Sequence, residues 1–320
     1  MAFKDHSIYT IAFYNLENLF DTEDDPLTLD DDFTVNAPRQ WNAKRFQKKI
    51  KKLGRVISQI GYNDIQHPPA IVGIAEVENE TVVKALVDSK FLKDKGYQYV
   101  HFDSSDERGI DTALLYRSDY VTILEANTHT LYLENAPGVR DYTRDILHIR
   151  GTLQGQEVHI LVNHWPSRRQ GAEETAYKRI AAAQKNLEIV HNIAEDNPKA
   201  KCIIMGDFND DPHSESLTTL SKNGFFNPME TLLTQQQGSS THRGAWNLFD
   251  QILISGAMMT KNYEHFQYYK AGVFKKDYLV TSTGQYKGYP FRSYGYNGYL
   301  GGYSDHFPVY LYLIKKKNPR

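Results

Sequence analysis

The stretch that decides the fold runs Cys202-Ile203-Ile204-Met205-Gly206-Asp207-Phe208-Asn209-Asp210. Its apolar run is typical of a buried strand and stops abruptly at a glycine followed by polar residues. Residues i and i+2 of an extended chain point to the same side, so Asp207 and Asn209 are expected to present a carboxylate and an amide together. Ends of strands in α/β sheets commonly bind ligands. A strand followed by an Asx turn explains the segment equally well.

On either side of this segment, short apolar runs alternate with helical patterns. Apolar residues recur at helical spacing over 41–60 and 172–193, which predicts two long helices, and 81–90 fits a short one. Further strands are predicted over 8–14, 70–77, 97–102, 112–116, 121–126, 146–153, 157–162, 251–255 and 308–314. Both halves of the chain run strand, long helix, strand. This pattern indicates two β-sheets packed face to face with helices outside.

Length and composition are those of a globular protein. The chain has 320 residues, of which 40% are hydrophobic and 24% charged, and this suits one large α/β domain. No linker-like stretch or repeat of fixed period divides it, so residues 1–320 are expected to form a single domain. The formal net charge of −2 argues against a strongly electrostatic nucleic-acid binder but is compatible with a local basic rim.

The location of the protein is predicted from what the sequence lacks. Residues 1–7 do not form the long apolar stretch of a signal peptide, and no segment approaches the ~18–20 apolar residues of a membrane span. The single Cys202 lies in an apolar run and forms no intramolecular disulfide. We expect a cytoplasmic protein with no membrane association and no obligate protein partner. A leader already removed would leave no trace in this sequence.

Two segments have an unusual composition. Residues 21–32 are strongly acidic and are expected to form a solvated loop, which would repel a polyanion. Residues 284–303 are rich in glycine and tyrosine. Their aromatic rings are suited to stack on bases or sugars, or equally to pack on the protein's own scaffold.

Polar residues border the apolar runs at five further places. They are Asn15, Glu17 and Asn18; Glu76; Asn163 and His164; Asp250; and Asp305 with His306. Each alone has a structural explanation, such as a cap, a surface group or a hydrogen-bonded histidine. Together they bring carboxylates, amides and two imidazoles to the ends of core strands. A purely structural role does not explain why so many polar groups converge.

Metal-assisted attack on a phosphate ester is the chemistry that fits this set. Hard divalent cations such as Mg²⁺ take oxygen ligands from one or two carboxylates, water and phosphate. Glu76 is the first ligand candidate, and Asp305 and Glu17 would complete or extend the shell. The sequence has no Cys/His cluster at zinc spacing, no glycine-rich phosphate loop and no Gly-x-Ser-x-Gly motif.

The remaining groups have roles around an attacking water. Asp207 is suited to orient or deprotonate the water, and Asn209 to hold that water or a phosphate oxygen. His306 would lie against the phosphate, with Asp250 fixing its tautomer and favouring its charged form. His164 would donate a proton to the leaving group or bind a nonbridging oxygen.

The ordered motifs resemble those of the endonuclease/exonuclease/phosphatase superfamily, which has the DNase I-like fold. They run Tyr14-Asn15-Leu16-Glu17-Asn18, Ala75-Glu76-Val77, Asn163-His164-Trp165, Gly206-Asp207-Phe208-Asn209, Asp250-Gln251-Ile252-Leu253 and Ser304-Asp305-His306. The resemblance implies a four-layer α/β sandwich and a phosphodiesterase or phosphatase that depends on Mg²⁺ or Mn²⁺. It also implies catalytic or metal-binding roles for Asn15, Glu17, Glu76, His164, Asp207, Asn209, Asp250, Asp305 and His306.

Within the superfamily, the stretches 109–117 and 164–182 resemble the bacterial extracellular-nuclease-like branch. Arg144 resembles a position at which relatives use arginine against phosphate, a role that suits a guanidinium group. Asn163 and Arg168 are further phosphate-binding candidates. A basic rim beside the site would be formed by Arg168, Arg169 and Lys178.

Three hypotheses about function follow. The first is a nuclease that acts on DNA or RNA, which the ordered motifs and the basic rim favour. The second keeps the chemistry but changes the substrate to a small phosphoester of a sugar, inositol or lipid headgroup, which the near-neutral charge and the acidic 21–32 segment favour. The third is an inactive binding module on the same fold.

Overall fold

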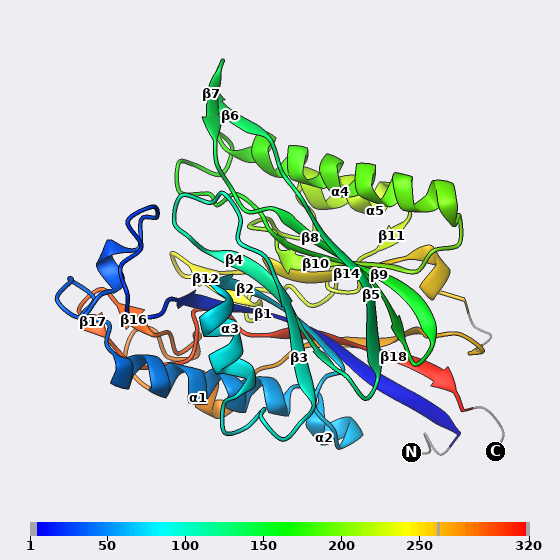
Figure 1. The fold of residues 1–320 in the computed structure, drawn as a ribbon, viewed down its shortest axis with the longest axis horizontal. Coiled ribbons are helices and arrows are strands. Elements are labelled where there is room, and N and C mark those ends of the chain that lie inside the picture. The colour runs from blue at the N-terminus through cyan, green and yellow to red at the C-terminus, as the bar shows by residue number, and fades with distance from the viewer. Residues whose placement is uncertain (1–4, 261–262, 318–320) are drawn as a thin grey trace.

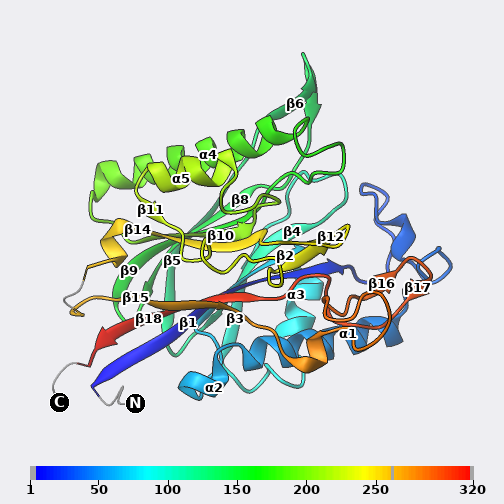
Figure 2. The same cartoon turned by 180° about the vertical axis from the view of Figure 1, so that it is seen from behind.

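The computed structural model describes residues 5–260 and 263–317. The expectation about a leader rested partly on residues 1–4, which lie outside these ranges. Two six-stranded mixed β-sheets pack face to face, and helices cover their outer faces (Figures 1 and 2). This arrangement confirms the four-layer α/β sandwich predicted from the sequence.

The first sheet places the ends of two parallel strands side by side. Its strands, in spatial order, are β15 (Gln267–Val273), β18 (Val309–Lys316), β1 (His6–Leu19), β2 (Ile71–Val77), β4 (Asp111–Arg117) and β3 (Tyr97–His101). β1 and β2 are parallel, and Asn15 pairs with Ala75. The carboxyl ends of both strands therefore meet at one edge, with Asn15 beside the residue that precedes Glu76.

The second sheet repeats this arrangement. Its strands, in spatial order, are β11 (Phe225–Phe226), β14 (Asp250–Ser255), β10 (Cys202–Asp207), β9 (Gln156–His164), β8 (Ile146–Leu153) and β5 (Val121–His129). β9 and β10 are parallel with Asp207 opposite His164, while β14 is antiparallel to β10 with Asp207 opposite Asp250. The register alone thus sets Asp207 between His164 and Asp250.

Helices cover the outer faces of both sheets. On the first sheet lie α1 (Ala43–Gln59) and α3 (Glu80–Val87), with the short α2 (Tyr62–Ile65) after α1; on the second lie α4 (Ala176–Asp196) and α5 (Glu215–Lys222) (Figure 1). α1 buries Phe46, Ile50, Leu53 and Ile57, which recur at the spacing of one helix face. Its first turn is capped by the side chain of Asn42.

Three two-stranded ribbons extend from the loops. They are β6 (Leu133–Ala136) with β7 (Val139–Asp141), β12 (Ser240–His242) with β13 (Ala245–Asn247), and β16 (Tyr294–Gly295) with β17 (Gly298–Tyr299). Single 3₁₀ turns are η1 (Asp31–Phe33), η2 (Gly256–Met258) and η3 (Asp277–Leu279). The β6–β7 ribbon projects furthest from the body, beyond the end of α4 (Figure 1).

All of the strands and helices predicted from the sequence are present, and the longest elements that were not predicted are β15 and α5. β15 is an edge strand whose pairing shifts register between Tyr268 and Lys270, so its side chains do not alternate between buried and exposed. α5 is a single short helix rich in serine and threonine, which have modest helix propensity. Both departures occur where the local periodicity is weak.

The aromatic segment 284–303 packs mainly on the protein's own scaffold. Tyr294 and Tyr303 are buried in the core beneath α1, and the ring of Tyr289 contacts Trp246 edge-on. Tyr296 is fully exposed. The packing explanation therefore accounts for most of these rings.

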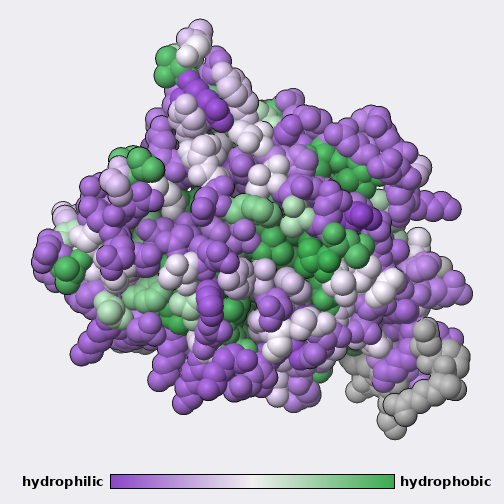
Figure 3. Space-filling view, in the orientation of Figure 1, coloured by the Kyte–Doolittle hydropathy of each residue, from purple (hydrophilic) through white to green (hydrophobic). Residues whose placement is uncertain are grey.

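Polar groups dominate the surface. The face shown in Figure 3 is mainly hydrophilic, and its hydrophobic residues gather in patches across the middle. Among residues 5–260 and 263–317, no helix combines the length and the apolar character needed to cross a membrane.

Candidate active site

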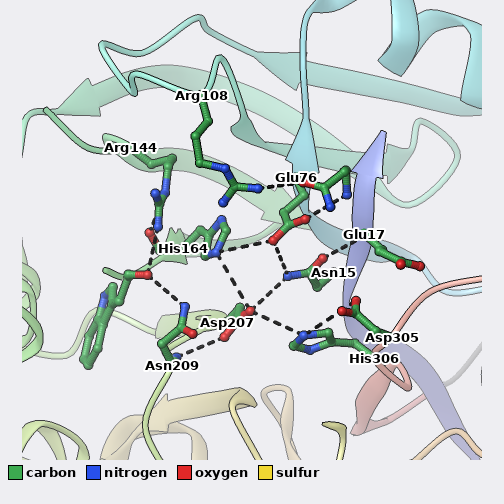
Figure 4. A network of polar contacts seen from close by, with 12 residues as sticks. Asn15, Glu17, Glu76, Arg108, Arg144, His164, Asp207, Asn209, Asp305 and His306 are labelled. Atoms are coloured by element: carbon green, nitrogen blue, oxygen red, sulfur yellow. Dashed lines mark hydrogen bonds and ion pairs between the residues drawn. The ribbon is translucent and has the colours of Figure 1, made fainter. Parts of the chain in front are cut away.

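Side chains from both sheets converge on the carboxylate of Asp207 (Figure 4). Asn15 Nδ2 donates to Asp207 Oδ2 at 2.9 Å and to Glu76 Oε1 at 3.3 Å. The Nε2 atoms of His164 and His306 each lie 3.9 Å from the same Asp207 oxygen. One buried carboxylate oxygen thus faces an amide and two imidazoles.

The other oxygen of Asp207 is held by the turn that follows the strand. The backbone N–H of Asn209 donates to Asp207 Oδ1 at 2.9 Å, which is the Asx turn that the sequence allowed. The side-chain Nδ2 of Asn209 donates to the carbonyl of Trp165 at 2.9 Å. The turn and the polar cluster are therefore not alternatives, because the turn orients Asp207 within the cluster.

Burial controls the protonation of Asp207. Its side chain is almost fully enclosed, and this burial raises its pKa, an effect that the imidazole of His306 opposes and the carboxylate of Asp250 reinforces. The result is a pKa of about 6. A carboxylate with this pKa exchanges a proton near neutral pH far more readily than an ordinary aspartate.

His306 is held in its charged form by Asp250. Its Nδ1 lies 2.6 Å from Oδ2 of Asp250, which is fully buried. Burial alone would lower the pKa of His306, but Asp250, together with Asp207 and Asp305, raises it well above its ordinary value. The Nε2–H of a cationic His306 therefore points toward Asp207 and the space in front of it.

His164 is held in the opposite, neutral state. Burial lowers its pKa well below the ordinary value, and the nearby guanidinium groups of Arg144 and Arg108 lower it further. Its Nε2 lies 3.9 Å from Glu76 Oε1 and from Asp207 Oδ2. Its buried Nδ1 has no hydrogen-bond partner among the residues that the structure describes. The two histidines of the cluster thus differ in charge.

The backbone around the cluster adopts an uncommon conformation. Glu17, Asn18, Glu76 and Asn209 all have positive φ, between 49° and 62°. They make up four of the nine non-glycine residues with positive φ in the described ranges. This conformation costs of order 1–3 kcal/mol per residue outside glycine and concentrates at functional sites. It lets the backbone N–H of Asn18 reach Glu76 Oε2 at 2.7 Å.

Glu17 does not join the cluster. Its carboxylate is buried and accepts hydrogen bonds from the backbone N–H groups of Ser293, at 2.6 Å, and Tyr294. In Figure 4 it points away from Asp207 and Glu76. Burial, with a smaller effect of Asp305, raises the pKa of Glu17 to about 7. The sequence predicted that Glu17 is a metal ligand. In the structure its carboxylate instead anchors the segment that enters the β16–β17 ribbon.

Asp305 lies at the open side of the site. Its side chain is 32% exposed, and its Oδ2 accepts a hydrogen bond from Nη2 of Arg292 at 2.8 Å. Its Oδ1 lies 4.0 Å from His306 Nε2. Asp305 therefore presents one carboxylate oxygen beside the catalytic candidates while Arg292 holds the other.

The phosphate-binding candidates from the sequence have different environments. Arg144 is buried and donates to Asp106 Oδ2 at 2.8 Å and to the carbonyls of His164 and Trp165. These bonds make it a brace for the backbone that carries His164. Arg168 donates to the carbonyl of Asn209 at 2.6 Å and to Asp210 Oδ1 at 2.5 Å, so it braces the turn after β10.

Asn163 lies outside the cluster. It is fully buried, and its amide exchanges hydrogen bonds with Asn186 of α4 and accepts one from the indole N–H of Trp165. Neighbouring residues of a strand face opposite sides, so His164 and Asn163 cannot both point into the site. The sequence suggested that Asn163 binds phosphate; the structure directs it to the helix layer instead.

Like Arg292, which holds Asp305, Arg108 lies in this region and was not predicted from the sequence. Its Nη2 donates to Asn18 Oδ1 at 2.6 Å, and Figure 4 shows its guanidinium beside Glu76. Arg108 directly precedes the 109–117 stretch, which resembles the bacterial extracellular-nuclease-like branch. The sequence feature that could have indicated Arg108 is a positively charged residue in the loop before a core strand.

Comparison with known proteins places this geometry in a family. A model described as the endonuclease/exonuclease/phosphatase family matches residues 10–315. The chain belongs to this family. Its membership supports a phosphoester hydrolase. No protein with a curated description matches the chain by sequence.

Solved structures of endonuclease/exonuclease/phosphatase proteins share the fold. A family protein from Bacteroides thetaiotaomicron is 18% identical, with a TM-score of 0.60 over 98% of this chain and 100% of that one. The mannosyl-6-phosphatase of the same organism is 18% identical, with a TM-score of 0.56 over 95% and 99%. D. rerio TDP2 with a single-strand DNA product is also 18% identical, with a TM-score of 0.56 over 96% and 99%.

The donor atoms of the site fit the hard divalent cation typical of this family. Glu76 and Asp305 offer carboxylate oxygens, the ligands that Mg²⁺ and Mn²⁺ prefer. Asp207, Asp250 and His306 also bring one ligand atom each within 4.8 Å of the others. The 2.6 Å contact between His306 and Asp250 is a hydrogen bond, however, which occupies one potential ligand atom of each residue.

Proposed function

We propose that the chain hydrolyses phosphoester bonds by attack of a water molecule that Asp207 orients and deprotonates. The observation that carries the proposal is the convergence of Asn15, His164 and His306 on one oxygen of Asp207. Asn15 fixes the direction of the carboxylate, and the pKa of about 6 leaves Asp207 ionised at neutral pH yet able to accept a proton.

The two histidines would divide the work on the phosphate. The cationic His306, backed by Asp250, would hold a phosphoryl oxygen by a charge-assisted hydrogen bond. The neutral His164 would contact a second nonbridging oxygen. Its low pKa means that the ring carries no extra proton near neutral pH, so it has none to give to the leaving group. Asn209, at the turn after Asp207, would hold the attacking water or a phosphate oxygen.

The cation would be Mg²⁺ or Mn²⁺, bound mainly by Glu76 with Asp305 at the open side. When bound, it would neutralise charge that develops on the phosphoryl oxygens. The amide of Asn15 and the backbone N–H of Asn18 fix the two oxygens of Glu76, so this ligand is oriented before a cation arrives.

We propose phosphodiester bonds of DNA or RNA as the substrate. Arg108 at the site supplies positive charge for a polyanion, and so does the exposed Arg169, which is close enough to affect both Arg108 and His164 electrostatically. The TDP2 relative, which was solved with a DNA product, supports this choice by analogy of fold.

A small phosphoester is the second candidate, and a specific observation favours it. The expected basic rim is largely neutralised: Arg168 pairs with Asp210 at 2.5 Å and Lys178 pairs with Asp141 at 2.8 Å. A neutral rim provides little attraction for a long polyanion. The mannosyl-6-phosphatase relative shows that this fold also serves sugar phosphates in another protein.

A substrate panel separates these candidates. The full chain would be incubated with Mg²⁺ or Mn²⁺ and single- and double-stranded DNA, RNA, sugar phosphates and inositol phosphates, with Asp207→Asn as the matched control. We expect cleavage of nucleic acid that depends on the cation, falls steeply with salt and is lost in the control. Turnover of small phosphoesters alone would establish the second candidate. No turnover of any substrate with cation present would leave the inactive binding module.

We further propose that residues 1–320 act as one cytoplasmic domain without an obligate partner. The support for a single domain is that the Asp207 cluster takes Asn15 and Glu76 from the first sheet and His164 from the second, whereas the location and the lack of a partner stay predictions from the sequence. Neither half of the chain would hold the cluster alone.

A further inference from the structure

A second group of metal-ligand side chains lies between β3 and β4, apart from the Asp207 cluster. His101 is the last residue of β3, Asp111 is the first of β4, and Asp103 lies in the loop between them. His101 Nε2 is 3.6 Å from Asp111 Oδ2, and His101 Nδ1 is 3.9 Å from Asp103 Oδ1. The three residues each bring one ligand atom within 4.8 Å of the others.

One nitrogen of the imidazole in this group is buried, and no described residue forms a hydrogen bond with it. The side chain of His101 is 3% exposed, and its Nε2 has no hydrogen-bond partner among the described residues although it faces Asp111. Asp111 is 5% exposed, and its other oxygen already accepts from the backbone N–H and the hydroxyl of Ser104. A buried nitrogen left without a partner is costly, so a group that bonds to His101 and Asp111 together would stabilise both.

The donor set selects the class of cation. One imidazole nitrogen and two carboxylate oxygens suit a transition metal such as Zn²⁺, which binds such atoms at about 2.0–2.2 Å. Two atoms at that distance from one ion are separated by roughly 3–4 Å, and the 3.6 Å between His101 and Asp111 falls in this range. Mg²⁺ and Ca²⁺ prefer oxygen ligands alone. We propose that His101, Asp103 and Asp111 bind a divalent transition metal ion, Zn²⁺ in the first instance.

An ion can reach this site from solvent. A cavity of about 800 Å³ is lined by Asp103 and Asp111, and its wall also carries Asp25, Asp106 and Glu107. These acidic side chains attract cations to the cavity. Asp103 Oδ1 lies nearest Nδ1, the other ring nitrogen, so the 83% exposed side chain of Asp103 would move toward Nε2 to complete the ligand set.

The ion would fasten a loop that reaches the active site. His101 and Asp111 lie at the two ends of loop 102–110, which carries Asp106 and Arg108. Asp106 holds Arg144 and accepts the backbone N–H of Arg108 at 3.1 Å. Binding at the loop's ends would therefore restrict the residues that brace His164 and neighbour Glu76. This consequence for activity rests on the proposed function, whereas the metal site does not.

Calorimetry on the chelator-treated full chain tests the site. Zn²⁺ would be titrated in excess Mg²⁺, and Co²⁺ would be followed by its visible absorption as a separate probe of coordination. We expect saturable binding by the wild type, and a loss of affinity of about 10-fold or more in His101→Gln and Asp111→Asn. The matched control is His191→Gln, which alters a histidine that is 76% exposed on α4.

The outcomes separate this proposal from the proposed function. Glu76→Gln should retain Zn²⁺ binding even if it abolishes hydrolysis, because Glu76 is not a ligand of this site. Thermal melts show whether each variant folds, and Zn²⁺ should raise the Tm of the wild type but not of His101→Gln. The proposal is wrong if the wild type shows no saturable Zn²⁺ binding, or if His101→Gln binds as tightly as the wild type.

Discussion

Asp250 Oδ2 lies 2.6 Å from Nδ1 of His306, and this contact joins the second sheet to the segment that leads into the last strand of the first. The hydroxyl of Ser304 supports the join, since it accepts the backbone N–H of His306 and donates to the carbonyl of Asn15. The charge of the imidazole therefore depends on how the two sheets are packed.

Asp250→Asn should reduce kcat/KM by about 10²-fold or more, because the amide removes the main effect that keeps His306 charged. Loss of Asp250 lowers the pKa of His306. As the pH is raised, activity that needs the imidazolium should therefore be lost at a lower pH in Asp250→Asn than in the wild type. A kcat/KM–pH profile of both proteins checks this. An unchanged alkaline limb would show that the charge of His306 is not used.

Asp207→Asn should lower kcat by about 10²–10³-fold or more, since an amide cannot accept the proton of water. In the wild type, activity should fall as the pH drops through about 6, because protonated Asp207 has lost its basicity. A bound cation would move this limb to lower pH. The check is kcat against pH at saturating Mg²⁺, with thermal melts to exclude unfolding.

Glu76→Gln and Glu17→Gln make the same chemical change but should affect different properties, the first the cation requirement and the second the stability. Glu76→Gln should raise the Mg²⁺ concentration for half-maximal activity by about 10-fold or more, because its oxygens are oriented toward the cluster. Glu17→Gln should mainly lower the Tm, because it weakens the hydrogen bonds to Ser293 and Tyr294. A larger cation requirement in Glu17→Gln than in Glu76→Gln would contradict the orientation seen here.

Arg108→Gln should raise KM with a smaller change in kcat, since the guanidinium is placed to attract the substrate phosphate. Arg150→Gln is the matched control, because Arg150 pairs with Glu125 and Glu157 on the outer side of the second sheet. Steady-state kinetics of both variants decide the point. Equal KM values for Arg108→Gln and the wild type would remove Arg108 from the site.

Acid stability should depend on His148. Burial, together with His159 and His129, lowers its pKa from 6.5 to about 4. Between these values the unfolded chain binds a proton that the folded chain does not, so folding stability falls as the pH drops from about 6.5 to about 4. His148→Gln should lose less stability than the wild type over this window, measured by urea unfolding at several pH values. Parallel losses in both proteins would contradict the assignment.

The sequence predicted those parts of the site that depend on strand ends. Asn15, His164 and Asp207 follow apolar runs, and the parallel pairing of core strands brings such ends together whatever the loops do. The Asp207–Asn209 turn was also visible as a local pattern. These features follow from short-range periodicity and from the topology of the sheets.

Other features depend on contacts between distant segments and were not predictable. Glu17 turns away because the backbone of residues 293–294 offers it N–H groups, 276 and 277 positions along the chain. Asn163 was placed at the site because its strand ends there, although its side chain faces α4. Arg108 was not predicted because its partner Asn18 is 90 positions away in the sequence.

The left-handed residues at the centre of the site have a consequence for how the protein would change under selection. Glycine at Asn18, Glu76 or Asn209 would relieve the local conformational cost. The same replacement would remove a carboxylate or amide, or the turn that aims one. Selection for heat resistance alone would therefore favour replacement at these three positions, and their persistence in a thermostabilised library would be a sign that catalysis is under selection as well.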